Sequence, residues 1–180
     1  MRELYKTEIS NQWKTLCEHP QWSSMWKSES PYFIPEWGIP NQFPYIKNVL
    51  NAEIEGIKEK HDVKELWLQI YGPYTGINTF HKDNDIDRNV LILYTNPRSF
   101  NYEIITSKEN EVRDYWIDKW NNKINVDKFN NEFINAGNKI HIGNVGSVYS
   151  FGSTIHFFWN DSNSYRVSIL FDINKEKQII

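Results

Sequence analysis

The sequence has one cysteine, no run of lysine and arginine, and no long apolar segment. A single cysteine, Cys17, excludes an intramolecular disulfide and is typical of a reducing compartment. Because no secretory or membrane-spanning segment is present, we expect a soluble cytoplasmic protein. The net charge of −3 and the missing basic stripe make nucleic acid an unfavoured partner.

Length and composition are those of one globular domain. The chain has 180 residues, of which 39% are hydrophobic and 16% are aromatic, and this is enough to bury an ordinary core. No internal repeat and no shift in composition marks a second domain, so we expect a single domain over residues 1–180. The sequence leaves the oligomeric state open.

The first third of the chain differs in pattern from the rest. Residues 46–60 carry apolar side chains at helical spacing, and Pro44 stands where a helix can begin. Three X-Pro steps make residues 28–45 an irregular, extended stretch. Residues 1–64 are therefore expected to form a helical and irregular N-terminal support.

Residues 65–173 have the pattern of a β-roll. Short runs rich in strand-forming residues are separated by Gly, Pro, Asn, Asp and Ser. The runs predict strands over residues 66–71, 77–82, 89–94, 100–106, 139–142, 147–151, 155–160 and 165–173. About eight short strands with this punctuation indicate a sandwich or jelly roll. The fold class we expect is mainly β with N-terminal helices.

One segment interrupts the strand pattern. Residues 108–138 are polar and rich in asparagine, yet they contain several aromatic residues. This segment is too aromatic for a disordered linker, so we interpret it as a partly helical insertion between the halves of the roll. Its position makes it a candidate lid over an active site.

Three side chains are spaced as ligands of a redox-active metal. His81 and Asp83 are separated by one residue, and His156 follows much later. Two imidazoles and one carboxylate form the facial triad that holds iron(II) and leaves coordination positions open. A His-x-Asp pair alone arises by chance in about one such chain in four. Both residues of the pair lie near the end of a predicted strand, where positions i and i+2 share a face.

A second group of residues follows the distal histidine. Arg166 lies ten residues after His156, and Ser168 lies two residues further on. A guanidinium donates two parallel hydrogen bonds to a carboxylate, so this pair predicts a clamp for a dicarboxylic cosubstrate. The alternative for Arg166 is a solvated charge on an edge strand.

Together these residues resemble the iron(II)/2-oxoglutarate-dependent dioxygenases, whose core is a double-stranded β-helix. The resemblance covers roughly residues 65–173 and includes the Arg166-x-Ser168 cosubstrate motif. Tyr71-Gly72-Pro73 is similar to the Tyr-Gly-Pro-Gly element of prolyl-hydroxylase-like members, in which the tyrosine contacts the cosubstrate. Tyr74 stands at the position of the second glycine and is the alternative to Tyr71.

The resemblance implies a hydroxylase that uses Fe(II), 2-oxoglutarate and O2 and releases succinate and CO2. Its substrate would be a small molecule or a peptide, and the arginine at position 166, where prolyl hydroxylases have lysine, weakens the case for proline. The carboxylate of Asp83 favours hydroxylation over halogenation. Asn84 and Trp159 are candidate substrate contacts, although a solvated loop and core packing are the plainer interpretations of these two residues.

Two other functions stay open at this point. One is a non-catalytic, cupin-like β-roll that binds a metal and a ligand. The other is modification of a nucleobase, which the acidic charge disfavours. Arg166 and Ser168 separate the first alternative from the oxygenase, because a plain cupin has no need for a dicarboxylate clamp.

Overall fold

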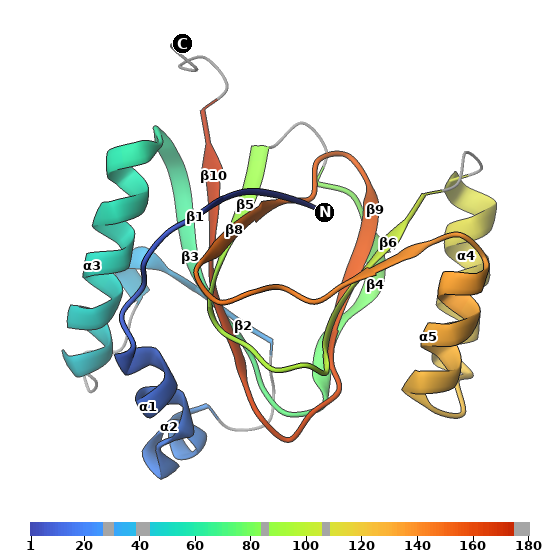
Figure 1. Ribbon diagram of the computed structural model, residues 1–180, viewed down its shortest axis with the longest axis horizontal. Helices are drawn as coiled ribbons and strands as arrows, with labels where there is room; N and C mark the ends of the chain where they lie inside the picture. Colours follow the sequence, from blue (N-terminus) through green and yellow to red (C-terminus); the bar gives the residue numbers. More distant parts are fainter. Residues whose placement is uncertain (27–30, 39–43, 84–86, 106–108, 175–180) are drawn as a thin grey trace.

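The computed structural model describes residues 1–26, 31–38, 44–83, 87–105 and 109–174. In this part of the chain, two antiparallel sheets face each other and helices cover the outer side of each (Figure 1). Sheet A has the strand order β1-β8-β5-β10-β3-β2, and sheet B has the order β4-β9-β6-β7. None of the helices in the described residues is both long enough and apolar enough to cross a membrane.

The bounds of the elements follow the order of the chain. They are β1 (Arg2–Lys6), α1 (Gln12–Glu18), α2 (Pro20–Met25), β2 (Tyr32–Pro35), the 3-10 turn η1 (Glu36–Gly38), α3 (Pro44–Lys60), β3 (Val63–Tyr71), β4 (Thr75–His81), β5 (Asp87–Tyr94), β6 (Ser99–Ile104), α4 (Glu109–Asn121), α5 (Val126–Asn135), β7 (Lys139–His141), β8 (Ser147–Ser150), β9 (Ile155–Asn160) and β10 (Arg166–Ile173).

The strand pairing is that of a long hairpin rolled into a double-stranded β-helix. Strand β3 pairs with β10, β4 with β9, β5 with β8, and β6 with β7. The first strand of the roll thus pairs with its last, and so on inward to the tip of the hairpin. This nesting confirms the predicted jelly-roll fold. Helices α4 and α5 lie between β6 and β7, at the tip.

Two strands were not predicted. Strand β1 pairs with β8, and β2 pairs with β3, so both extend sheet A beyond the roll. Strand β1 is largely exposed and lacks apolar alternation. Strand β2 ends in Pro35, which is tolerated because β2 is an edge strand. Neither β1 nor β2 has the run or alternation of apolar residues by which a buried strand is predicted.

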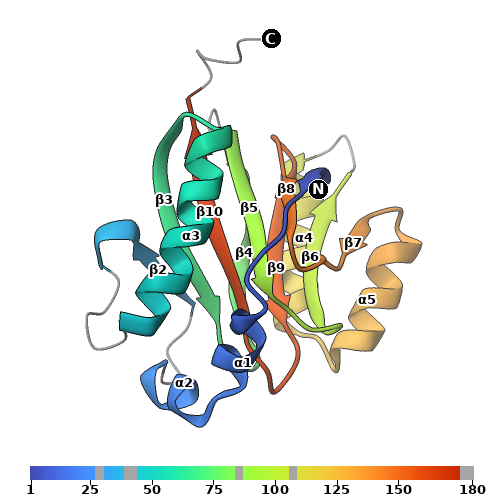
Figure 2. The same cartoon turned by 60° about the vertical axis from the view of Figure 1, so that its left-hand side comes forward.

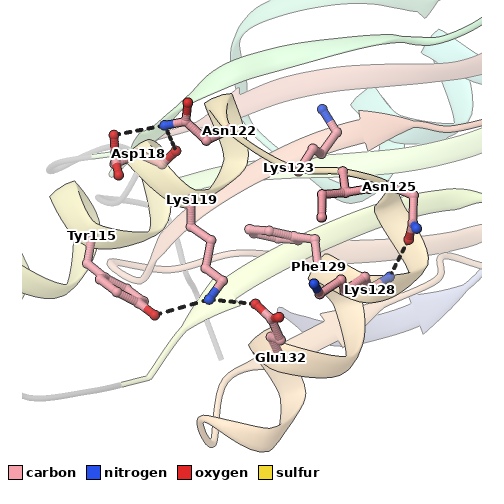
Figure 3. Close-up of a pocket in the computed structure, with 10 residues that line it drawn as sticks. Tyr115, Asp118, Lys119, Asn122, Lys123, Asn125, Lys128, Phe129 and Glu132 are labelled. Carbon is pink, nitrogen blue, oxygen red and sulfur yellow. Dashed lines mark hydrogen bonds and ion pairs between the residues drawn. The ribbon is translucent and has the colours of Figure 1, made fainter.

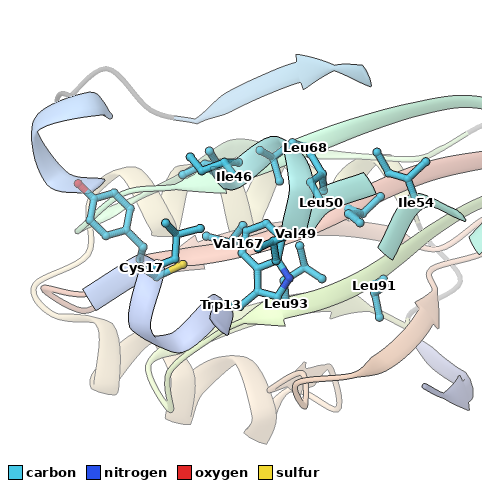
Figure 4. Packing of buried hydrophobic residues seen from close by; sticks show 14 of the residues in the cluster. Trp13, Cys17, Ile46, Val49, Leu50, Ile54, Leu68, Leu91, Leu93 and Val167 are labelled. Atoms are coloured by element: carbon cyan, nitrogen blue, oxygen red, sulfur yellow. The ribbon is translucent and has the colours of Figure 1, made fainter. Parts of the chain in front are cut away.

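The outer face of sheet A packs against the N-terminal helices (Figure 2). Helix α3 begins at Pro44, two residues before the predicted start, and buries one face that includes Ile46, Leu50 and Ile54. Trp13 and Cys17 of α1 fill the space beside them (Figure 4). Most of the N-terminal tryptophans therefore pack the helices onto the roll.

The outer face of sheet B is covered by α4 and α5. Trp116 and Trp120 from α4 and Phe133 from α5 pack with Tyr102 and Phe157, which point outward from β6 and β9. The described part of the predicted insertion therefore lies outside the roll (Figure 1). The lid hypothesis requires these helices to lie over the interior, and the structure does not place them there.

Pairing between β4 and β9 depends on a close backbone approach at Gly76. A Cβ atom added to Gly76 would lie 2.1 Å from the carbonyl oxygen of Phe158 and 2.9 Å from the Cα of Trp159. At Gly56, in α3, an added Cβ would meet nothing within 4 Å. Any side chain at position 76 must therefore push these two strands apart.

We therefore predict opposite effects for two glycine substitutions. Gly76→Ala should lower the free energy of unfolding by about 1–3 kcal/mol, because it overpacks a strand pair. Gly56→Ala should raise it by roughly 0.5–1 kcal/mol, because alanine favours the helix. Urea denaturation of both variants measures the two changes. Equal stability of the Gly76→Ala variant and the wild type would show that the β4–β9 contact yields without cost.

Candidate metal and anion site

The interior of the roll carries polar side chains among apolar ones, whereas the side chains that point outward to the helices are mostly apolar. Successive side chains of a strand alternate between faces, so β9 directs His156 and Phe158 inward and Phe157 and Trp159 outward. The same alternation directs Arg166 and Ser168 of β10 inward, away from the α3 layer. Between the sheets lies a cavity of about 140 Å³. It is lined by Phe33, Gln69, Tyr71, Ile77, His81, Asp83, Arg88, Val90, Asn101, Phe151, His156, Phe158, Arg166 and Leu170.

The three predicted metal ligands meet in this cavity. His81, at the end of β4, is the register partner of His156, at the start of β9, and their ring centroids are 4.5 Å apart. Asp83 follows β4, and its Oδ2 lies 3.5 Å from His156 Nε2. One ligand atom from each residue lies within 4.8 Å of the others. Within the described residues, this is the only such group of three potential ligands.

The surroundings of His156 favour the form that binds metals. Its Nδ1 lies 3.0 Å from the carbonyl oxygen of Thr154, which assigns the ring proton to Nδ1 and leaves the Nε2 lone pair facing Asp83. Burial, reinforced by the neighbouring His81, lowers the pKa of His156 to about 4. The ring is therefore neutral at pH 7, as metal ligation requires.

Arg166 is a buried cation without a carboxylate partner among the described residues. Its side chain is 2% exposed, and burial lowers the pKa of its guanidinium to about 10. In the described part of the chain, its Nε atom has no hydrogen-bond partner. The guanidinium lies 4.1 Å from the centroid of the Phe158 ring and 5.8 Å from that of Tyr71. A buried charge requires a counter-ion, so this end of the cavity has the character of an anion site.

A hydrogen-bonded chain lies beside Arg166. Ser168 donates from Oγ to Gln69 Oε1 at 2.7 Å, and Gln69 donates from Nε2 to Tyr71 Oη at 2.9 Å. Because Tyr71 accepts this bond, its own hydroxyl proton remains available to a ligand. The prediction that Ser168 donates directly to the cosubstrate does not match this arrangement, in which Ser168 instead holds the amide of Gln69.

Gln69 was not identified from the sequence. Its signal is its position two residues before Tyr71 in a strand that is otherwise mostly apolar, since residues i and i+2 point to the same face. Tyr74, the alternative to Tyr71, is 58% exposed and lies in the β3–β4 turn with φ of 54°. It occupies the left-handed conformation that glycine adopts readily, and it does not line the cavity.

The two candidate substrate contacts do not join this group. Trp159 points to the outer face of sheet B, where its ring lies 5.3 Å from Trp120, so it does not line the cavity and its contact with a substrate stays a prediction. The sequence already indicates this orientation, because residue 159 is three positions from His156 and side chains an odd number of positions apart in a strand point to opposite faces. Asn84 lies outside the described residues.

A larger cavity of about 320 Å³ lies between α4 and α5 (Figure 3). Its central charged pair is Lys119 with Glu132, at 2.6 Å, and Lys119 also donates to Tyr115 at 3.3 Å. Lys119 is paired, so this groove has no counterpart of Arg166, the buried charge inside the roll that has no carboxylate partner among the described residues. The smaller cavity is therefore the better candidate site.

Comparison with known proteins gives little further direction. No family model and no curated protein matches the sequence. Among solved structures, a Drosophila melanogaster CENP-C cupin domain matches at 13% identity with a TM-score of 0.37, over 59% of each chain. The structure of Drosophila melanogaster CENP-C bound to CAL1 matches at 12% identity with a TM-score of 0.37, over 59% of this chain and 62% of that one. The fold assignment above rests on strand order alone.

The triad predicts that the protein binds a divalent transition metal. Titration with Co(II), followed by its visible absorption, should show one site. His81→Ala and His156→Ala should weaken binding by more than the roughly 10–100-fold that loss of an outer-shell partner costs.

His19→Asn provides the control for this titration. His19 caps α2 by accepting a bond from the Gln21 amide, and asparagine is also a good N-cap, so Co(II) affinity should stay unchanged. Tight binding that survives both triad substitutions would place the metal elsewhere.

Proposed function

We propose that this protein is an iron(II)/2-oxoglutarate-dependent oxygenase that hydroxylates a small-molecule or peptide substrate and releases succinate and CO2. One observation carries the proposal: a cluster of two imidazoles and a carboxylate shares a cavity with a buried arginine that has no acidic partner among the described residues. The cluster suits a metal and the arginine suits a carboxylate. A cosubstrate that both chelates a metal and carries a distal carboxylate matches both halves of the cavity.

The donor set fits iron(II). His81, Asp83 and His156 supply three ligands and leave further positions open to cosubstrate and O2, as in the 2-His-1-carboxylate oxygenases. When bound, iron and 2-oxoglutarate together supply the oxidising power for attack on a C–H bond. The protein contributes the orientation of the ligands and the exclusion of water.

The residues around Arg166 would hold the distal carboxylate. The guanidinium offers a planar fork, and the hydroxyl of Tyr71 offers its proton, because its oxygen already accepts from Gln69. Phe158 covers one face of the guanidinium and keeps water from competing. A cavity of about 140 Å³ is smaller than the roughly 300–1,000 Å³ of sites for drug-sized ligands, so it suits a small acid.

A buried guanidinium such as that of Arg166 lowers the stability of the protein when no carboxylate ligand is bound. Replacing a buried, unpartnered charge with an apolar side chain of similar length removes its desolvation penalty. A residue kept for binding therefore opposes stability at its own position, whereas a residue kept for packing does not.

We predict opposite effects of Arg166→Met on stability and binding. The variant should unfold at a higher urea concentration than the ligand-free wild type, while its Kd for 2-oxoglutarate should rise roughly ten- to a hundredfold, the equivalent of one charge-assisted hydrogen bond. Calorimetric titration of the metal-loaded protein measures Kd.

Arg166→Lys is the matched variant. It keeps the charge but not the fork, so it should restore only part of the affinity. Wild-type affinity in a folded Arg166→Met protein would show that the cosubstrate binds without this residue.

Turnover separates the oxygenase from a non-catalytic, cupin-like β-roll that only binds metal and ligand. With Fe(II), 2-oxoglutarate and O2, pooled amino acids and peptides should increase succinate release by the wild type, and His81→Ala should abolish the release. A wild type that binds both Fe(II) and 2-oxoglutarate but releases no succinate with any pool would favour the non-catalytic roll.

A further inference from the structure

Arg88 connects the metal cluster to the opposite sheet. It lies at the start of β5, where its register partner on β10 is Asp172. The pair forms two parallel hydrogen bonds, from Arg88 Nε to Asp172 Oδ1 at 2.9 Å and from Nη2 to Oδ2 at 3.0 Å. Asp172 is buried. A bidentate bond between directly paired strands fixes the plane of the guanidinium.

The remaining terminal nitrogen of Arg88 is directed at Asp83. Arg88 Nη1 donates to Asp83 Oδ1 at 2.9 Å, while the other carboxylate oxygen, Oδ2, faces His156 Nε2 at 3.5 Å. The two oxygens of one carboxylate are thus divided between an arginine and the metal cluster. The ring of Trp67 lies 5.6 Å from the guanidinium and restricts its movement from the side.

Arg88 and its two carboxylate partners together carry a net charge of −1. Asp172 and Asp83 are its two carboxylate partners, so the positive charge of Arg88 is already matched by Asp172. Arg88 therefore orients Asp83 without removing the negative charge that a metal ion requires. Its contribution is geometric.

We infer that Arg88, held by Asp172, is a positioning residue that restricts Asp83 to coordination through a single oxygen. An unrestrained carboxylate can bind a cation through both oxygens, which would fill a position that an oxygenase leaves open. The inference rests on the metal site of the proposed function. It does not depend on the identity of the cosubstrate or the substrate.

A similar arginine elsewhere in the molecule provides a matched control. Arg98 also bridges two aspartates, Asp127 and Asp161, and its ring contact is with Phe100. It does not line the cavity inside the roll. Arg88→Lys and Arg98→Lys each keep a charge and remove a fork, but only the fork of Arg88 contacts the metal cluster. Arg98 is also more exposed than Arg88, at 41% against 24%, so thermal stability is measured alongside Co(II) binding.

The experiment measures Co(II) affinity and the Co(II) absorption spectrum of the wild type, Arg88→Lys, Asp172→Asn and Arg98→Lys. Arg88→Lys should raise the Kd for Co(II) about 10–100-fold, the usual effect of losing an outer-shell partner, and change the intensity of the visible bands as Oδ1 is released. Asp172→Asn should change both in the same direction by a smaller factor. Arg98→Lys should leave both unchanged.

The possible results distinguish a missing role of Arg88 from a missing metal site. If the wild type binds Co(II) and Arg88→Lys binds it with the same Kd and spectrum, Arg88 has no positioning role although the metal site stands. If Arg88→Lys and Arg98→Lys lower Co(II) affinity and thermal stability equally, the effect is structural and the inference fails. A wild type that binds no Co(II) removes both the metal site and the role assigned to Arg88.

Discussion

The site depends on the antiparallel pairing of β4 with β9. This pairing sets His81 directly opposite His156 and requires a glycine at position 76, where the two backbones come close. The two histidines are 75 positions apart in the chain, so nothing local brings them together. Rolling one long hairpin places the end of its second strand beside the start of its second-last strand, and the cluster of His81, Asp83 and His156 forms at that junction.

Sheet polarity is the second constraint. Each sheet turns its apolar face outward to a helical layer, α1 to α3 on one side and α4 with α5 on the other (Figure 1). The helices supply the burial that stabilises the fold, which leaves the inner faces free to carry histidine, arginine and carboxylate side chains. Burying Arg166 without a carboxylate partner among the described residues lowers the stability of the empty protein, and the outer layers offset this cost.

The strands of the roll could be predicted from the sequence because strand-forming runs between turn residues are a local signal. The proximity of His81, Asp83 and His156 could also be predicted, because each lies at or next to the end of such a run. The contacts of Gln69 and Arg88 inside the roll could not be predicted, because they depend on which strands become neighbours across it. The sequence indicated an inserted segment with helical character, but it did not indicate that the segment packs on the outer face of sheet B. A segment at the tip of a hairpin can fold to either face of a sheet. Strand parity alone places Trp159 on the face of β9 opposite to His156.

The central claim is that one cavity holds a metal and a chelating dicarboxylate together. The most direct measurement is the visible spectrum of the anaerobic protein with Fe(II) as 2-oxoglutarate is added. The account predicts a metal-to-ligand charge-transfer band that saturates at one equivalent of 2-oxoglutarate, does not form with succinate, and is absent in His81→Ala. A protein that binds Fe(II) tightly but shows no such band at any concentration of 2-oxoglutarate would contradict it.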